Sequence, residues 1–132
     1  MMITKAYGTL VLASQEKEEI MTYTPADLET AFDVMLAADI GYWTNEARID
    51  AENALIVCED DEDAKSVRIT PAAFLDWLKT DGPAALIGQI HDRYQKAAIA
   101  DLVAHNWDNL DYDVETGDFI IQQIVLGEIR YS

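Results

Sequence analysis

Cationic residues are scarce in this sequence. Its 132 residues include 25 Asp and Glu but only 9 Lys and Arg, which gives a formal net charge of −16 at pH 7. Each contact with a phosphate backbone or an anionic lipid headgroup would therefore add repulsion instead of releasing counterions. The composition argues against direct binding to nucleic acids or membranes, and it favours a basic protein or nucleoprotein complex as partner.

Cysteine is almost absent as well. The single thiol, Cys58, has no partner for an internal disulfide, and no paired Cys and His spacing predicts a structural zinc site. No apolar run approaches the roughly 20 residues that span a bilayer. Residues 1–14 lack the basic leader and the long apolar segment of a signal peptide. These absences predict a soluble protein of the cytoplasm.

Glycine and proline are also few, with six and three residues, whereas half of the chain is apolar. Such a composition supports a packed core and excludes a disordered or low-complexity chain. The length fits one domain, and no linker or internal repeat interrupts the sequence. We therefore expect residues 1–132 to form a single acidic α+β domain.

Two Thr-Pro pairs mark helix starts. Thr24-Pro25 and Thr70-Pro71 each combine a hydroxyl N-cap with a proline in the first helical turn. The first helix is predicted to run toward Gly41, and the second to end at Asp81-Gly82-Pro83. The apolar side of the first helix is predicted from three- and four-residue spacing to contain Leu28, Ala31, Phe32, Met35, Leu36 and Ile40. Two more helices are predicted over residues 84–104 and 119–126, the last one closed by Gly127.

Segments rich in β-branched and aromatic residues predict the strands. They lie at residues 2–13, 20–23, 47–51, 54–58, 66–69 and 129–131. The acidic run from Glu59 to Asp63 falls between two of them and is expected at the tip of a hairpin. The predicted fold class is α+β, with about four helices packed on a small, mostly antiparallel sheet.

Two segments carry a resemblance to a known group of proteins. Residues 31–45, AFDVMLAADIGYWTN, join an apolar helix to Gly-Tyr-Trp, and residues 118–132, DFIIQQIVLGEIRYS, join an apolar helix containing Gln to Gly-Glu and a closing Tyr. The matching positions are Gly41, Tyr42, Trp43, Asp118, Gln122, Gly127, Glu128 and Tyr131. The pattern resembles a family of small acidic proteins of bacteriophages and other mobile elements, for which no activity is established.

The resemblance implies a mobile-element origin, and therefore the cytoplasm of a host cell as the place of action. Such elements carry small acidic proteins that block host restriction or CRISPR systems, some of them by resembling DNA. By analogy with those proteins, the resemblance suggests an anti-defence role of the anti-CRISPR or anti-restriction type.

Acidic residues gather in stretches that lack bases. Seven acids and no base lie between Lys17 and Arg48, and seven more acids lie in the base-free stretch from residue 97 to residue 129. On a folded chain this asymmetry predicts a strongly negative face. Acids about 6.6 Å apart on a strand, or about 9 Å apart along a helix, approximate a subset of the phosphates of a duplex. Solubility alone is the other interpretation of the same charge.

The acids expected to contact a partner fall in three segments. They are Asp27, Glu29 and Asp33 on the first helix, Glu59, Asp60, Asp61, Glu62 and Asp63 at the hairpin tip, and Asp108, Asp111, Asp113 and Glu115 before the last helix. Tyr42 and Trp43 are predicted to be partly exposed and to act as apolar anchors.

No motif for catalysis or metal binding stands out. The run at 59–63 lacks the alternating ligands and central glycine of a calcium loop, and in the segment 111–118 Thr116 and Gln122 occupy the places of that glycine and of the last carboxylate. His91-Asp92 lacks the further His and Asp ligands of metal-dependent phosphohydrolases. We therefore expect a non-enzymatic protein without a metal or cofactor.

Three functions remain as hypotheses. The first is a phage or mobile-element inhibitor that binds a basic nucleic-acid-binding cleft of a host defence complex by DNA mimicry. The alternative is a homodimeric structural or regulatory phage module, in which the apolar segment Phe119–Leu126 contributes to the shared interface. A third is a metal-assisted hydrolase that uses the acidic loops.

Overall fold

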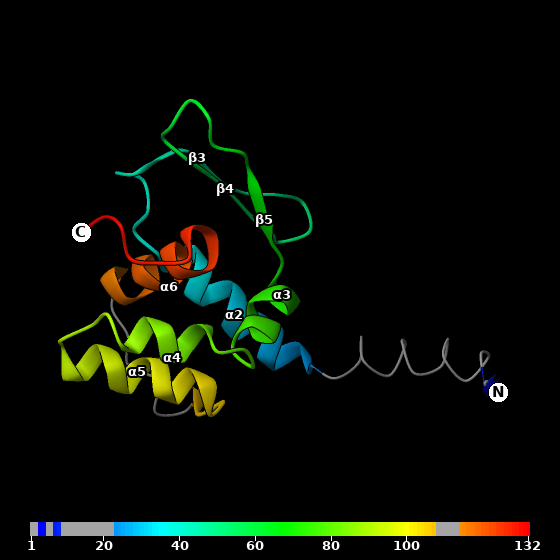
Figure 1. Cartoon of the computed structure of the whole chain (residues 1–132). Helices are drawn as coiled ribbons and strands as arrows, with labels where there is room; N and C mark the ends of the chain where they lie inside the picture. The colour runs from blue at the N-terminus through cyan, green and yellow to red at the C-terminus, as the bar shows by residue number, and fades with distance from the viewer. Residues whose placement is uncertain (1–2, 5–6, 9–22, 108–113) are drawn as a thin grey trace.

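The computed structural model describes residues 3–4, 7–8, 23–107 and 114–132 (Figure 1). It is a small α+β fold, as the sequence predicts, and the five helices among the described residues agree roughly with the expected four. The elements in chain order are β1 (Ile3–Thr4), β2 (Tyr7–Gly8), α2 (Pro25–Ala37), β3 (Thr44–Ile49), β4 (Leu55–Glu59), β5 (Val67–Ile69), α3 (Pro71–Trp77), α4 (Gly82–Ile87), α5 (Arg93–Val103) and α6 (Val114–Leu126).

The predicted hairpin at 54–69 is confirmed as part of an antiparallel sheet with the strand order β3-β4-β5. The central strand β4 is buried along its whole length. Because side chains alternate between the faces of a sheet, Leu55 and Val57 enter the core while Ile56 points to the other face. There Ile56 lies between Arg48 and Arg68 on the neighbouring strands. β1 and β2 form a separate antiparallel pair within the segment predicted as a strand at 2–13.

β3 forms one edge of this sheet. Its pairing with β4 is interrupted by a shift in register between Thr44 and Glu46. Beyond the shift, Arg48 Nε lies 2.9 Å from Glu46 Oε2 in an exposed ion pair. The edge strand is therefore both irregular and charged.

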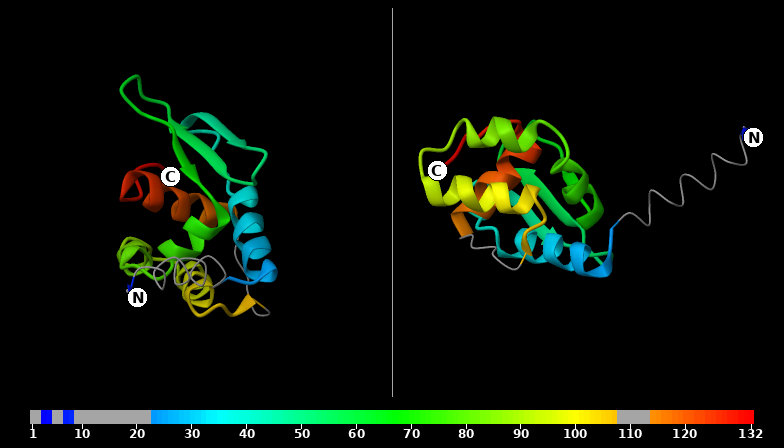
Figure 2. Two further views of the ribbon diagram at one scale, coloured as in Figure 1. Left: turned by 90° about the vertical axis from the view of Figure 1, so that its right-hand side faces the viewer. Right: turned by 90° about the horizontal axis from the view of Figure 1, so that it is seen from below.

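The sheet and the helices form layers (Figures 1 and 2). α6 lies between the sheet and the pair α4 and α5, and α2 and α3 flank it. The buried core draws side chains from every one of these layers, including Met35, Val57, Phe74, Ile99 and Ile120. α6 is thus the central element of the fold.

The loop between β3 and β4 is closed by the carboxylate of Asp50. Its Oδ1 accepts hydrogen bonds from the backbone N–H groups of Glu52 at 2.8 Å and Ala54 at 3.0 Å. Asn53 adopts a φ of 63°, which asparagine tolerates better than most residues. Arg68 donates to Asp50 Oδ2 at 2.8 Å from the adjacent part of the sheet. The loop is therefore held from both of its ends.

The predicted start of α2 is confirmed, but its predicted apolar side is only partly buried. Ala31 and Met35 are buried, as is Val34, which the spacing argument did not include. Leu36 leaves 59% of its surface exposed. The prediction was wrong for Leu36 because the apolar arc of the helix is wider than the core that it contacts. The helix also stops at Ala37, before Gly41.

The single helix predicted over residues 84–104 is in fact two helices, α4 and α5. Asp92 caps the second one, because its Oδ1 accepts hydrogen bonds from the N–H groups of Tyr94 at 2.8 Å and Gln95 at 3.1 Å. The prediction failed because apolar residues recur at helical spacing across the break, at Leu86, Ile90, Tyr94 and Ala97, although Tyr94 and Ala97 are exposed.

Two expectations for the C-terminal part need correction. The segment 129–131 is not a strand, because side chains of α6 and of the connection between α4 and α5 bind its backbone in place of a neighbouring strand. The helix expected at 119–126 begins earlier, at Val114, and its residues 119–123 are buried in the core of the same chain. Residues 119–123 are therefore not free to form a dimer interface, whereas Ile124, Val125 and Leu126 are only partly buried. Of the strand expected at 20–23, only Tyr23 is described, and it lies in a bend.

Gly117 permits the close approach of α6 to the end of α2. A Cβ atom at this position would lie 3.1 Å from Ala38 Cα and 3.2 Å from Ala38 Cβ. We expect Gly117→Val to lower the free energy of unfolding by about 2 kcal/mol, because the two backbones must separate. Urea unfolding measures this loss. Gly41→Ala, at a site with nothing within 4 Å of the added Cβ, is the control and should change stability by less than about 0.5 kcal/mol. Equal effects of the two substitutions would contradict the packing argument.

Candidate functional site

Asp27 belongs to the start of α2 and is not simply a surface acid. Its N–H donates to Thr24 Oγ1 at 3.1 Å while its Oδ2 accepts from the N–H of Thr24 at 3.2 Å, which completes a capping box. Trp107 Nε1 donates to Asp27 Oδ1 at 2.9 Å. The bond from Trp107 is the main reason that the pKa of Asp27 lies below its usual value. Asp27 therefore connects α2 to the segment that follows α5.

Glu29 and Asp33 differ from Asp27 because both are exposed and neither forms an ion pair within the described part of the chain. They are one turn apart on α2, and residues 23–47 contain no Lys or Arg. The ion pairs of the described residues lie instead on the sheet and the C-terminal segment. They are Arg48 with Glu46, Arg68 with Asp50 and Glu52, and Arg130 with Glu59 and Glu128. We call the solvent-exposed side of α2 with Glu29 and Asp33 its outer side. It is acidic, and no Lys or Arg among the described residues forms an ion pair with these two acids.

A groove lies beside these acids. We call it the α2 groove; its volume is about 630 Å³. Its lining residues are Pro25, Leu28, Glu29, Phe32, Glu52, Asn53, Thr70, Pro71 and Ala72. One wall is α2, the second is the β3–β4 loop and the third is the start of α3. Apolar side chains form most of the lining, and Glu29 and Glu52 are its two carboxylates.

The five acids expected at the hairpin tip differ in their exposure to solvent. Asp60, Asp61, Glu62 and Asp63 are exposed. Glu59 is only 8% exposed, and its carboxylate receives the Arg130 guanidinium at 3.0 Å and the Tyr131 hydroxyl at 2.6 Å. The structure therefore corrects the expectation for Glu59, which was predicted to face a partner but is used inside the protein.

The acids of the tip and those of α2 do not form one patch. The loop between β4 and β5 projects from the end of the molecule that is opposite the helices (Figures 1 and 2). Glu115 lies at the start of α6, where its Oε1 accepts from Gln95 Nε2 at 2.7 Å. Asp108, Asp111 and Asp113 lie outside the described residues.

Trp43 is not the exposed anchor that the sequence predicts, since only 2% of its surface is accessible. Its Nε1 donates to Asp118 Oδ1 at 2.7 Å, and the hydroxyl of Tyr42 donates to Asp118 Oδ2 at 2.5 Å. Gln122 Nε2 donates to the same carboxylate at 3.0 Å. Tyr42 remains 54% exposed, as expected for an anchor, but its hydroxyl is engaged. Burial, followed by the bond to Asp118, raises the pKa of Tyr42.

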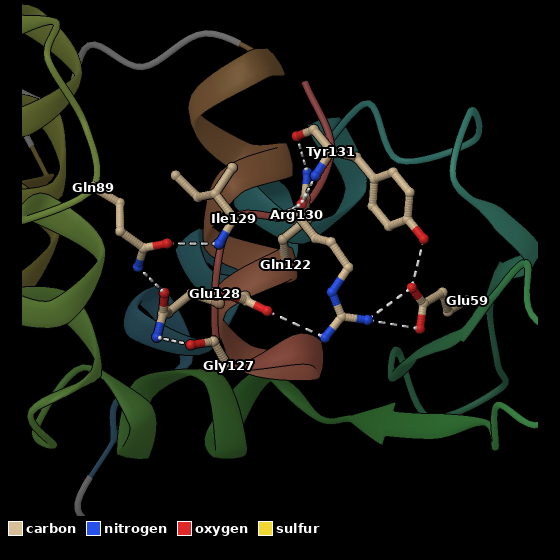
Figure 3. A network of polar contacts seen from close by, with 9 residues as sticks. Glu59, Gln89, Gln122, Gly127, Glu128, Ile129, Arg130 and Tyr131 are labelled. Carbon is tan, nitrogen blue, oxygen red and sulfur yellow. Dashed lines mark hydrogen bonds and ion pairs between the residues drawn. The ribbon is translucent and has the colours of Figure 1, made fainter.

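Gln122 also binds the C-terminal segment (Figure 3). Its Oε1 accepts hydrogen bonds from the backbone N–H groups of Arg130 and Tyr131, both at 2.8 Å, and its Nε2 donates to the carbonyl of Tyr131 at 2.8 Å. Gln89 Oε1 accepts from the N–H of Ile129 at 2.8 Å. Side-chain amides thus satisfy backbone groups that a neighbouring strand would otherwise bind.

The positions that carry the phage-family resemblance largely converge at this point. Tyr42, Trp43, Asp118, Gln122 and Tyr131 are joined by the bonds described above, and the rings of Trp43 and Tyr131 stack 5.8 Å apart. Sequence reasoning did not place these residues together. The one available signal was that two distant segments shared a resemblance to the same family. The cluster is fully hydrogen-bonded and connects three parts of the chain, so its evident role is structural.

No family model, curated protein or solved structure matches this chain. Within the residues that the structure describes, no group of three or more His, Cys, Asp or Glu side chains is arranged to hold a metal ion. No helix in that part of the chain combines the length and apolar character needed to cross a membrane. The α2 groove and the acids beside it are the surface features of the described residues that bear on function.

Replacing Gln122 tests the attachment of the C-terminal segment. Gln122→Met has similar volume but leaves two backbone N–H groups and one carbonyl without their partner, and it removes one of the three donors to the Asp118 carboxylate. We expect the free energy of unfolding to fall by about 3 kcal/mol. Gln89→Met, on the exposed side of the same network, should cost about 1 kcal/mol, since water replaces its bonds there. Denaturant unfolding measures both, and a larger loss for Gln89→Met would refute this interpretation.

The tyrosines of the cluster should make the fold sensitive to alkali. The hydrogen bond to Glu59 is the main cause that raises the pKa of Tyr131, and burial that of Tyr42. A raised pKa in the folded state means that the folded protein retains the phenol protons longer than the unfolded chain does. Stability is therefore intact below the ordinary tyrosine pKa of 10.0 and decreases as pH rises through the higher folded values.

The double variant Tyr42→Phe/Tyr131→Phe should lose less stability than the parent between about pH 9 and pH 11. Urea titrations at a series of pH values measure the two slopes. Tyr94→Phe, on an exposed ring of α5, is the control and should leave the slope unchanged. Parallel curves for the parent and the double variant would show that the cluster does not control the alkaline limit.

Proposed function

We propose that this chain is a non-enzymatic inhibitor, carried by a phage or mobile element, that binds a basic nucleic-acid-binding cleft of a host defence complex in the host cytoplasm. It competes there with DNA or RNA, in the manner of an anti-CRISPR or anti-restriction protein. The contact surface is the outer side of α2 with Glu29 and Asp33, together with the α2 groove.

The observation that carries this proposal is the separation of charge. Three of the arginines lie on the sheet and the C-terminal segment, where they pair with acids, whereas Glu29 and Asp33 on α2 face solvent with no ion pair among the described residues. Unpaired surface acids produce a negative potential, which steers a basic partner toward that side and accelerates association. The acids of the hairpin tip lie at the opposite end and are not part of the proposed contact.

The spacing on α2 is compatible with competition against a polynucleotide. Glu29 and Asp33 are four residues apart on a helix, which corresponds to about 6 Å along its axis. Phosphates on one strand of a duplex are about 3.4 Å apart along the axis, so the axial separation of the two acids is close to that of alternate phosphates. A cleft that binds a phosphate backbone would meet charges of the same sign and similar spacing on this helix.

Capture from a bacterial lysate tests the proposal. The immobilised protein should retain a nucleic-acid-binding protein at low salt, identified by mass spectrometry, and release it when salt is raised or when duplex DNA or RNA is added. Glu29→Gln/Asp33→Asn should weaken the binding of the identified partner about tenfold, since each exposed charge contributes roughly 0.7 kcal/mol.

The matched control is Asp60→Asn/Glu62→Gln, which removes the same two kinds of charge from the hairpin tip. It should leave the affinity nearly unchanged. Retention at about 1 M salt, indifference to polynucleotide, or an equal loss in the two double variants would each reject the proposed mode of binding.

A further inference from the structure

α2 carries more apolar surface than the core uses. Successive residues of a helix are about 100° apart, so Pro25, Leu28, Phe32 and Leu36 fall along one side, next to the buried side with Ala31, Val34 and Met35. Leu28 and Phe32 are half-buried and Leu36 is mostly exposed. We call Pro25, Leu28, Phe32 and Leu36 the apolar stripe of α2. It faces the α2 groove, whose lining includes Pro25, Leu28 and Phe32.

Acids border the same stripe. Glu29 lines the α2 groove, and Asp33 lies one turn further along the solvent edge of the helix. Glu52 forms part of the opposite wall, where Arg68 holds it at 2.6 Å and the loop around Asp50 fixes its backbone. The two walls therefore present carboxylates on either side of an apolar floor, in a groove formed by well-anchored elements.

The stripe continues into a second cavity. This cavity, of about 130 Å³, is lined by Leu36 and Met35 of α2 and by Ala47, Arg48 and Ile49 of β3, among others. Both cavities thus lie between α2 and the β3–β4 hairpin. We call the surface along α2 that joins the two cavities the seam. The 13 residues of α2 make the seam roughly 20 Å long. The carboxylates of Glu29 and Glu52 line the large cavity, whereas no acid among the described residues lines the small one, and Arg48 in its lining is paired with Glu46.

We propose that this seam binds an amphipathic cationic segment of the partner protein. Large apolar side chains of the segment pack on Leu28, Phe32 and Leu36, and its Lys or Arg residues lie beside Glu29, Asp33 and Glu52. Glu29 and Glu52 place the cations of the segment at the large cavity, and the small cavity, which no acid of the described residues lines, takes a neutral end. This inference rests on the proposed function and names the part of the basic partner that is bound.

Charge complementarity selects this occupant over the others. A second copy of the chain would bring another net charge of −16 to an acidic surface, and a polynucleotide would meet the same repulsion. A purely apolar segment would leave Glu29 and Asp33 at the rim without partners. A segment that carries both apolar and cationic side chains packs on the apolar floor and pairs with the carboxylates at the rim.

A synthetic peptide of about 15 residues, long enough to follow α2 as a helix, is the probe. It carries Leu at helical spacing on one side and Lys on the other, with a scrambled peptide of the same composition and a Lys→Gln peptide as comparisons. Titration followed by NMR should shift resonances of residues 25–36, 52–53 and 70–72 with the patterned peptide. The other two peptides should bind at least about fivefold more weakly, since each loses one of the two contacts.

Two variants locate the binding. Leu36→Ser should weaken the patterned peptide about fivefold, because it removes an exposed apolar contact that does not hold the fold together. Val103→Ser, an exposed apolar residue on α5, is the matched control and should leave affinity unchanged. Thermal unfolding of both variants should match that of the parent.

The outcomes separate this inference from the proposed function. Equal binding of the scrambled or the Lys→Gln peptide, equal effects of the two serine variants, or no binding of the patterned peptide would overturn the inference about the seam. The proposed function would survive each of these results if the partner from the lysate were still released by salt and polynucleotide. It would fall independently if that release were absent.

Discussion

The packing of α6 against the α2–β3 connection and the C-terminal segment depends on the hydrogen bonds of the Asp118 carboxylate. A carboxylate that is only 2% exposed must be supplied with hydrogen-bond donors, and this one receives them from Tyr42, Trp43 and Gln122. The first two fix the connection between α2 and β3, while Gln122 carries the network on to the C-terminal segment. Through Arg130 and Tyr131 that segment reaches Glu59 at the end of β4. One buried acid thereby sets the relative positions of a helix, a strand and the chain end.

Acidic residues in this protein serve two different purposes. Asp118 and Glu59 are buried and satisfied by donors from distant segments, so their charge is used within the fold. Glu29 and Asp33 remain at the surface, where their charge is available to other molecules. A net charge of −16 does not distinguish these classes. Only the environment of each carboxylate shows which acids are free to contact another molecule.

Local signals were predictable from the sequence and distant contacts were not. The Thr-Pro pairs at 24–25 and 70–71 start helices because a hydroxyl and a fixed φ act within one turn. The exposure of Glu29 and Asp33 follows from the same helix periodicity. The burial of Trp43 and Glu59, in contrast, depends on partners 75 and 71 residues away. The α2 groove likewise needs three elements whose arrangement no single segment encodes.

The strand order β3-β4-β5 leaves two edges of this sheet, and neither favours addition of a further strand. β5 has only three residues, and β3 is interrupted by its register shift and carries Glu46 and Arg48. Short, irregular and charged edges are the means by which sheets avoid edge-to-edge polymerisation. The same features that make the sheet small thus protect it from edge-to-edge aggregation.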